Sequence, residues 1–445
     1  MRGRFSGFTA ILLAALIALL VILPGTAGAA TSTQQEMYKV NTLDGVEIVL
    51  KRYRPDAASA FRAGKQPVIL MPGILCNHNF FDLHTPEGES CGVKLPSDLA
   101  DWAKGDPYVN ADPMRYYSLA YYLWDQGYDV WLVNYRGEGR DPVRSGGAGG
   151  YAIDELGIYD MPAIVTKVRS VTGKKPVWIG HSMGSTMAYM YLQGAKFSSA
   201  SDAGSHVVSD SWLASQRNNG TGSQALKGFV DLDGPVIPGG SIPALLQVLL
   251  WPALSTPLYL DLRPLTSNLG GLAADPLMAL ETMARWLWGT IGYPDLGLLN
   301  LLLLINPANM DPGVSRYFFR YGLDGVSTRV VAQFADAIVN GKLREDYRNG
   351  LLNSLLVAPP EPRSGDGYYY YSDNLGKIKL PALVIADATR DITNPEDIRS
   401  FYDRKTRNSK DRYYVISNTA HVDLVMGLNA PKELFPKIGD WLKSL

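Results

Sequence analysis

The sequence has few residues of the kinds that signal a disulfide scaffold, a metal site or a nucleic-acid surface. Only two of its 445 residues are cysteine, and only five are histidine. The 42 basic and 43 acidic residues nearly cancel, so no excess of positive charge points to nucleic acid. No group of potential ligands has metal-site spacing, and the phosphate-loop pattern G-x-x-x-x-G-K-[ST] does not occur. No cofactor and no metal are therefore expected.

Long hydrophobic runs are also scarce. The run at 8–23 follows Arg2 and Arg4 and precedes the small residues PGTAGAA at 24–30. This pattern is typical of a secretory signal peptide over 1–30, with an uncleaved N-terminal membrane anchor as the alternative. Later apolar segments carry proline or polar residues close by and are not predicted to span a membrane. We expect an exported protein, periplasmic or extracellular.

The two cysteines are Cys76 and Cys91. In an exported chain they are able to pair in a disulfide, which would close a short loop. Two free, buried thiols are the alternative, because the sequence does not give the distance between them.

Hydrophobic residues make up 46% of the chain, enough for a large core. Two β-rich runs flank a turn at 43–45 and predict a hairpin. Six later runs are rich in Val, Ile, Leu and aromatic residues and predict buried parallel strands: QPVILMPG, YDVWLVNYRG, KPVWIG, LKGFVDLDG, PALVIADA and RYYVIS. Helix-compatible segments between some of them, such as 159–173 and 395–406, favour an α/β fold with helices on both faces of a mostly parallel sheet.

Two segments interrupt this alternation of strands and helices. Residues 197–224 are rich in Ser, Gly and Asn and predict a flexible insertion. Residues 238–373 contain three apolar helical stretches with no strand between them, more than one crossover needs. We expect these residues to form a helical cap, or lid, over a core made of 36–237 and 374–445. Additional core packing is the alternative.

The stretch GHSMG follows the predicted strand KPVWIG and precedes a helix-compatible segment. This is the sequence form of a nucleophile elbow, G-x-S-x-G, in which a tight turn exposes a serine at the end of a strand. Gly180 and Gly184 permit the turn, Ser182 is the candidate nucleophile, and the N–H group of Met183 is a candidate oxyanion donor. An ordinary strand-to-helix turn is the alternative.

A nucleophilic serine needs a base and an orienting acid, in the chain order Ser, acid, His for this type of fold. His421 follows the last predicted strand and is the candidate base. Asp387, Asp391 and Asp397 all follow the strand PALVIADA. We expect Asp391 to be the acid because it lies inside the loop, whereas Asp387 is at the strand edge and Asp397 caps or begins the next helix.

The second oxyanion donor is expected in the loop after QPVILMPG. The N–H group of Ile74 is the candidate, with Gly73 allowing close approach of the backbone. His78 is nearby, but a histidine that precedes the nucleophile breaks the expected order. We therefore expect His78 to be structural or to contact substrate.

With these residues the chain resembles the α/β-hydrolases, and more narrowly the acid-lipase branch that includes lysosomal and gastric lipases. The resemblance runs from about residue 36 to the C-terminus with gaps. The stretches that carry it are DGVEIVLKRYRP, QGYDVWLVNYRG, YAIDELGIYDMPAIVTKVRSVTGKKPVWIGHSMGS, YGLDGVSTRVVAQFADAIVNGKLREDY, LPALVIADATRDITNPEDI and AHVDLVMG.

The resemblance implies that Ser182 is the nucleophile, Asp391 the acid and His421 the base. It also implies an oxyanion hole made by the N–H groups of Ile74 and Met183. Members of the branch hydrolyse esters of long-chain acyl groups beneath a cap.

Three features depart from the family pattern. Pro72 stands where the family has histidine before the glycine of the oxyanion loop, and Met183 stands where it often has glutamine. An extra segment at 76–113 separates that loop from the next helix. These departures concern the acyl pocket and the substrate more than the catalytic residues.

The sequence thus predicts a secreted serine ester hydrolase of lipase or carboxylesterase type that forms an acyl-enzyme on Ser182. Its expected partner is a lipid or another apolar ester, with transient contact between the cap and a membrane or lipid interface. A polyester depolymerase, a thioesterase or an acyltransferase would share the same fold and triad. A non-catalytic binding protein of this fold is a further alternative.

Overall fold

The computed structural model of the chain describes residues 35–55, 65–198, 206–239, 247, 251, 254–291, 304–348, 358–389 and 391–445. The expected signal peptide lies outside these residues. So do most of the first and last helical stretches expected in the cap, at 242–254 and 295–307. Within the described residues, no helix combines the length and the apolar character that a membrane span requires.

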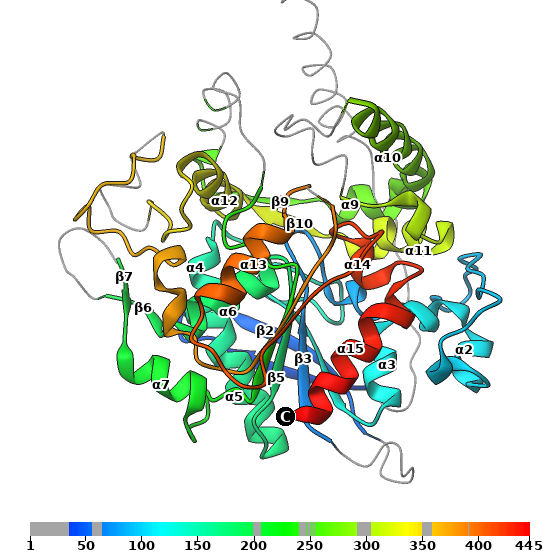
Figure 1. Ribbon diagram of the computed structural model, residues 1–445, viewed down its shortest axis with the longest axis horizontal. Coiled ribbons are helices and arrows are strands. Elements are labelled where there is room, and N and C mark those ends of the chain that lie inside the picture. The colour runs from blue at the N-terminus through cyan, green and yellow to red at the C-terminus, as the bar shows by residue number, and fades with distance from the viewer. Residues whose placement is uncertain are drawn as a thin grey trace, which may run out of the picture.

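The centre of the molecule is a β-sheet with helices around it (Figure 1). The sheet has eight strands in the order β1-β2-β4-β3-β5-β8-β11-β12. The pairs β1–β2 and β2–β4 are antiparallel, and all the others are parallel. The strands are β1 (Gln35–Asn41), β2 (Glu47–Tyr53), β3 (Pro67–Met71), β4 (Asp129–Asn134), β5 (Val177–His181), β8 (Gly228–Leu232), β11 (Ala382–Ala386) and β12 (Arg412–Val415).

Both faces of the central strands are buried, which explains why their sequences are continuous apolar runs. In β3, Val68 and Leu70 pack into the hydrophobic cluster on one face, and Ile69 and Met71 pack into the cluster on the other. The first face is covered by α3 (Leu119–Asp125) and α15 (Ala430–Ser444). The second face is covered by α5 (Met161–Thr172), α6 (Met183–Leu192) and α13 (Pro395–Arg404).

The predicted fold class is confirmed. Each of the six predicted buried runs contains one strand of this sheet, and the predicted hairpin is the β1–β2 pair. Gly45 occupies the hairpin turn with φ of +86°, a conformation that favours glycine. The helices expected in 159–173 and 395–406 are α5 and α13.

The described residues between β8 and β11 form a separate group of elements, called the inserted group, at the carboxyl end of the parallel strands (Figure 1). Its helices are α9 (Arg263–Leu265), α10 (Gly271–Ile291), α11 (Pro312–Tyr317) and α12 (Thr328–Asn340). The expectation of no strand here was wrong, because β9 (Tyr259–Asp261) and β10 (Gly325–Ser327) pair in an antiparallel ladder.

Polar contacts connect this group to the loop after β4. The Tyr259 hydroxyl lies 3.0 Å from both the carbonyl oxygen of Gly137 and Glu138 Oε1, within hydrogen-bond distance of each. The Arg263 guanidinium donates to the carbonyls of Gly137 (3.0 Å) and Gly139 (2.7 Å). These bonds satisfy buried carbonyl groups of the loop, so the base of the inserted group is held against the core.

The flexible insertion expected at 197–224 is largely regular structure, although 199–205 lie outside the described residues. The hairpin of β6 (Ala195–Phe197) and β7 (Val207–Ser209) is followed by α7 (Ser211–Asn219). The Asp210 carboxylate accepts from two N–H groups in the first turn of α7 and caps it. In the described part of this segment, polar side chains cap α7 and make buried hydrogen bonds.

The extra segment at 76–113 contains only short helices, including α2 (Pro107–Ala111), and packs beside the inserted group. Cys76 and Cys91 are both free, so a disulfide between them is not present. The buried Cys76 makes a backbone bridge with Leu323. Cys91 is half-buried, and its carbonyl lies against Gly313. The two cysteines therefore pack against different parts of the inserted group rather than against each other.

Substitution of Asn218 tests whether α7 is an integral part of the core. Its amide donates to the carbonyls of Leu192 (2.7 Å) and Ala214 (2.8 Å) and accepts from the N–H groups of Lys379 and Leu380. Asn218→Ala leaves several buried backbone groups without partners, so we expect it to lower the free energy of unfolding by about 2–4 kcal/mol in urea titrations. The exposed Asn110→Ala serves as the control. A change in Asn218→Ala no larger than in the control would show that α7 is only loosely attached.

Candidate active site

A sharp turn joins β5 to α6 and carries Ser182. The serine has φ of 53° and ψ of −124°, a left-handed conformation that is rare outside glycine. A Cβ atom on Gly180 would overlap the carbonyl of Gly184, and one on Gly184 would overlap the carbonyl of Met71. Both glycines are therefore required by close packing of the turn against its own helix and against β3.

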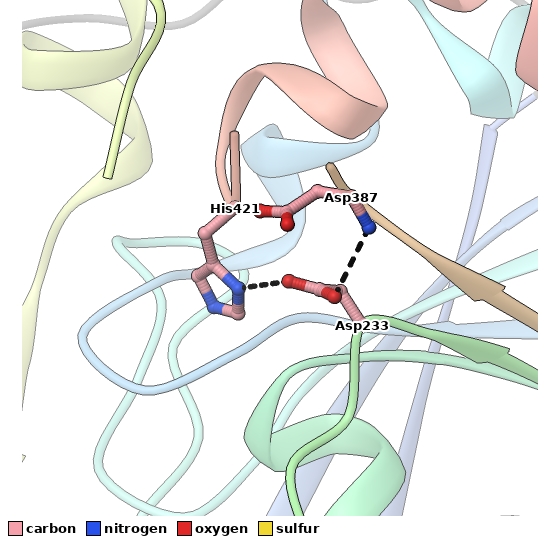
Figure 2. A group of neighbouring side chains, drawn as sticks. All are labelled: Asp233, Asp387 and His421. Carbon is pink, nitrogen blue, oxygen red and sulfur yellow. Dashed lines mark hydrogen bonds and ion pairs between the residues drawn. The ribbon is translucent and has the colours of Figure 1, made fainter. Parts of the chain in front are cut away.

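His421 lies between β12 and α14 (Asp423–Met426), at the carboxyl end of the sheet. Its ring Nδ1 is 2.6 Å from Oδ2 of Asp233, and both side chains are buried (Figure 2). Asp233 directly follows β8 and has φ of +56°. The short contact is that of a charge-assisted hydrogen bond from the imidazole N–H to a carboxylate, which fixes the ring with Nε2 free to act as a base.

The expected contact between Asp391 and the His421 ring is absent, which corrects the assignment made from the sequence. Asp391 Oδ2 instead accepts from the backbone N–H of His421 at 3.1 Å. Its Oδ1 lies 3.0 Å from the N–H of Thr393. The Thr393 hydroxyl is within hydrogen-bond distance of Asp391 (3.1 Å) and of Asp233 (2.7 Å). Asp391 thus supports the backbone of the histidine loop and connects to Asp233 through Thr393.

The two other aspartates considered from the sequence have different partners. The N–H group of Asp387 donates to Asp233 Oδ1 at 3.2 Å (Figure 2), while one oxygen of its buried carboxyl has no hydrogen-bond partner. Burial, together with the charges of Asp233 and Asp391, raises the pKa of Asp387 well above its ordinary value. Asp397 lies in the first turn of α13 and accepts from the N–H groups that precede the inserted group, at 236 and 237.

Asp233 was missed by the sequence reasoning, although it satisfies the chain order Ser, acid, His as well as Asp391 does. The sequence pattern that could have identified it is LKGFVDLDG, in which this aspartate and a glycine follow a predicted strand. Two predicted strands, LKGFVDLDG and PALVIADA, end near an aspartate, so this pattern does not single out one residue. Only the position of β8 between β5 and β11 brings Asp233 to the histidine.

The charge state of His421 depends on the surrounding carboxylates. Burial by itself lowers the pKa of the ring, but the hydrogen bond and charge of Asp233, with a further contribution from Asp391, outweigh burial. The pKa of His421 is therefore raised above its ordinary value of 6.5. A raised pKa makes the ring a stronger base once it is deprotonated.

Asp233, Asp387 and His421 present ligand atoms within 4.8 Å of one another, so this set was also considered as a cation site. A metal between a histidine nitrogen and a carboxylate oxygen would hold each at about 2.0–2.2 Å in tetrahedral geometry, with the two ligand atoms about 3.3 Å apart. The 2.6 Å contact between His421 and Asp233 is closer than that. The geometry fits an acid–base pair better than a metal centre.

The loop after β3 lies directly against the serine. A Cβ atom built on Gly73 would be 2.8 Å from Ser182 Cβ and 3.3 Å from Ser182 Oγ, so a larger residue would displace the nucleophile. Ile74 follows in this loop. Met183 is the first residue of α6, where an N–H group has no partner inside the helix. The two expected oxyanion donors therefore lie on the two chain segments next to Ser182.

Two further histidines lie near the site, and both are buried. His181 Nε2 donates to the carbonyl of His421 at 2.9 Å, and its ring stacks on Phe80. Burial lowers the pKa of His181 well below its ordinary value, so this ring is neutral. His78 bonds to Asn134 and has its pKa lowered to about 3, mainly by burial. His78 therefore makes a structural contact in the loop.

Ser182, Asp233 and His421 all lie at the carboxyl end of the parallel strands. The N–H group of Ser182 donates to the carbonyl of Leu232 at 3.0 Å, directly before Asp233. The ring of His181, directly before Ser182, lies 4.6 Å from the ring of His421. The Ser182 hydroxyl has no hydrogen-bond partner in the part of the chain that the structure describes. Such contacts often form only when substrate binds.

Comparisons with known proteins found a family of the same fold and several lipases. A family model described as alpha/beta hydrolase fold matches residues 105–220. Lipase member K of Homo sapiens is 23% identical over 329 residues, which is 72% of each chain. Lipase 3 of Drosophila melanogaster is 22% identical over 78% of this chain and 79% of its own. Lipase member M of Homo sapiens is 22% identical over 91% of this chain and 81% of its own.

Solved structures with similar folds include a monoacylglycerol lipase of Paleococcus ferrophilus, 13% identical with a TM-score of 0.45 over 89% of this chain and 98% of its own. A thermophilic esterase of Thermogutta terrifontis is 14% identical with a TM-score of 0.42 over 92% of this chain and 98% of its own.

The chain has an α/β-hydrolase fold, as the family model that matches residues 105–220 and the order of the sheet indicate. Among proteins of this fold, it resembles the acid lipases.

Proposed function

We propose that the protein is an exported serine ester hydrolase of lipase or carboxylesterase type. The observation that carries this proposal is the 2.6 Å bond between His421 and Asp233 beside a serine held in a left-handed turn. The similarity to several lipases supports hydrolysis of esters in general. The proposal of export rests on the signal-like sequence of residues 1–30.

In the proposed mechanism, His421 Nε2 removes the proton of Ser182 as the hydroxyl oxygen attacks the ester carbonyl. Asp233 holds the opposite side of the imidazole and stabilises the imidazolium that forms. The N–H groups of Ile74 and Met183 bind the negative oxygen of the tetrahedral intermediate. Collapse of the intermediate breaks the bond to the alcohol, which receives the proton from His421 and leaves an acyl-enzyme on Ser182.

Water then completes the reaction. His421 removes a proton from water as the water oxygen attacks the acyl carbonyl, and the second tetrahedral intermediate uses the same two N–H donors. Its collapse releases the carboxylic acid and returns the proton to Ser182. Transfer of the acyl group to another alcohol would differ only in the attacking molecule.

An apolar acyl chain is the proposed substrate group. On α10, Leu272, Met283 and Trp286 are exposed, the last at 70%. Exposed apolar side chains on a helix near the carboxyl end of the sheet favour contact with a lipid aggregate rather than with a small polar ester. We therefore propose that the inserted group contacts the lipid phase that contains the substrate.

Replacement of the nucleophile tests the proposed class of enzyme. Ser182→Ala should lower kcat for p-nitrophenyl esters by about 10⁴-fold or more, because the acyl-enzyme no longer forms. A fluorophosphonate probe should label the unaltered protein at Ser182 and leave the variant unlabelled. The exposed Ser170→Ala is the matched control and should behave like the unaltered protein. Absence of labelling in the unaltered protein would favour a non-catalytic binding protein.

The length of the acyl chain tests the proposed substrate class. We expect kcat/KM for p-nitrophenyl esters to rise by at least about tenfold from acetyl toward medium or long chains, since each buried CH₂ group contributes about 0.8 kcal/mol. The series from acetyl to palmitoyl is measured at substrate concentrations below aggregation. A sharp preference for acetyl would contradict a lipase-type pocket.

The identity of the acid is tested by comparing Asp233→Asn with Asp391→Asn. Loss of the carboxylate on the histidine ring should lower kcat by about 10³–10⁴-fold, as expected when the wrong tautomer forms. Asp391→Asn should lower kcat by about tenfold or less, because its main contact is a backbone N–H group. Larger damage from Asp391→Asn would restore the assignment made from the sequence.

The pH profile gives a second test of the same pair. Only neutral His421 is a base, so activity is lost as pH falls through its pKa. Because Asp233 raises that pKa, the acid limb of kcat/KM should lie above 6.5 in the unaltered protein and move to lower pH in Asp233→Asn. An acid limb that does not move would show that Asp233 has no electrostatic effect on the base.

A further inference from the structure

The peptide bond between Gly73 and Ile74 is central to the proposed oxyanion hole. A trans peptide is planar, and its C=O and N–H groups point in opposite directions. Fixing the direction of the Gly73 carbonyl therefore fixes the direction of the Ile74 N–H group. The partners of that carbonyl decide whether the N–H group points toward the serine.

The carbonyl of Gly73 has a buried side-chain partner. The Tyr135 hydroxyl donates to it at 3.1 Å, and the N–H group of Cys76 lies 3.3 Å from it. Tyr135 follows the last residue of β4, and its ring packs in the hydrophobic cluster on one face of the sheet. It is 1% exposed, so its hydroxyl does not exchange this bond for one to solvent.

The last residue of β4 also contacts the same loop, at His78. Asn134 Oδ1 accepts from the N–H group of His78 at 2.8 Å. Asn134 at the end of β4 and Tyr135 directly after it thus hold the loop at His78 and at Gly73. Because a strand in the middle of a sheet is rigid, this arrangement leaves the peptide at Gly73 little freedom to rotate.

The loop at Gly73 also lies against the nucleophile. The position of a Cβ atom on Gly73 is 3.3 Å from Ser182 Oγ, so this part of the loop is in direct contact with the serine. Within the described residues, no acceptor is present for the N–H group of Ile74. A free N–H group beside the serine is what an oxyanion donor requires.

We propose that Tyr135 is a positioning residue that orients the Gly73–Ile74 peptide so that the Ile74 N–H group points at the developing oxyanion. This inference rests on the proposed function. Burial raises the pKa of Tyr135 well above its ordinary value, so the hydroxyl keeps its proton and remains a donor throughout the working pH range.

Tyr135→Phe tests the proposal because it removes one hydroxyl and keeps the ring. We expect kcat to fall about 10- to 100-fold, less than or similar to the loss of a whole oxyanion donor, while KM changes less than about twofold. Tyr317→Phe is the matched control, since Tyr317 is equally buried and donates to the carbonyl of Asp82 at 3.2 Å. The control should keep kcat within about twofold.

The affinity for an alkyl boronic acid reports on the oxyanion hole and does not change when only the stability of the fold is reduced. The boronate forms a tetrahedral adduct with Ser182 and places an oxygen in the oxyanion hole. Its Ki should rise in Tyr135→Phe by about the same factor as kcat falls, with thermal unfolding midpoints similar in the two Phe variants. An unchanged kcat, or an unchanged boronate Ki, would overturn the proposal.

Hydrogen exchange separates this proposal from the proposed function. Exchange of loop peptides covering 72–78, followed by mass spectrometry, should be faster in Tyr135→Phe than in Tyr317→Phe. If the unaltered protein neither hydrolyses esters nor reacts with fluorophosphonate, the proposed function fails, and faster exchange still supports the orienting role of Tyr135. Equal exchange in the two variants would overturn that role whatever the activity.

Discussion

The site depends on a steric constraint at the turn between β5 and α6. A side chain at Gly180 would collide with the backbone of the helix that follows, and one at Gly184 would collide with β3. The chain is therefore able to reverse direction within a few residues and to hold Ser182 in a left-handed conformation. The strain of that conformation is sustained by the buried strand and helix on either side.

The order of the strands brings the other residues of the site to this turn. β5 lies between β3 and β8, so the loops that leave these neighbouring strands meet at the serine. The loop after β3 brings Gly73 against the nucleophile, and the loop after β8 brings Asp233 to His421. The inserted group connects to the same region, because the N–H group of Asp324 donates to the carbonyl of Leu75 at 2.8 Å. Its base therefore contacts the loop that carries Ile74.

Buried carboxyl groups are concentrated around His421. Asp233 bonds to the ring, Asp391 to the backbone N–H, and Asp387 lies beside both with a raised pKa. Several like charges so close together are unfavourable, and together with burial they raise the pKa of Asp387. The Thr393 hydroxyl lies between Asp233 and Asp391 and couples the two loops. These contacts connect His421 to the loops that follow β8 and β11.

The sequence by itself determined the strands, the elbow and the histidine, because apolar runs, glycines in a tight turn and chain order are local properties. It did not determine which aspartate contacts His421, because Asp233 and Asp391 satisfy the same local rules and differ only in where β8 and β11 place them. The hydrogen bonds of Asn218 and the separation of Cys76 from Cys91 likewise join segments far apart in the chain. These contacts were decided by tertiary structure, since only packing brings such segments within bonding distance.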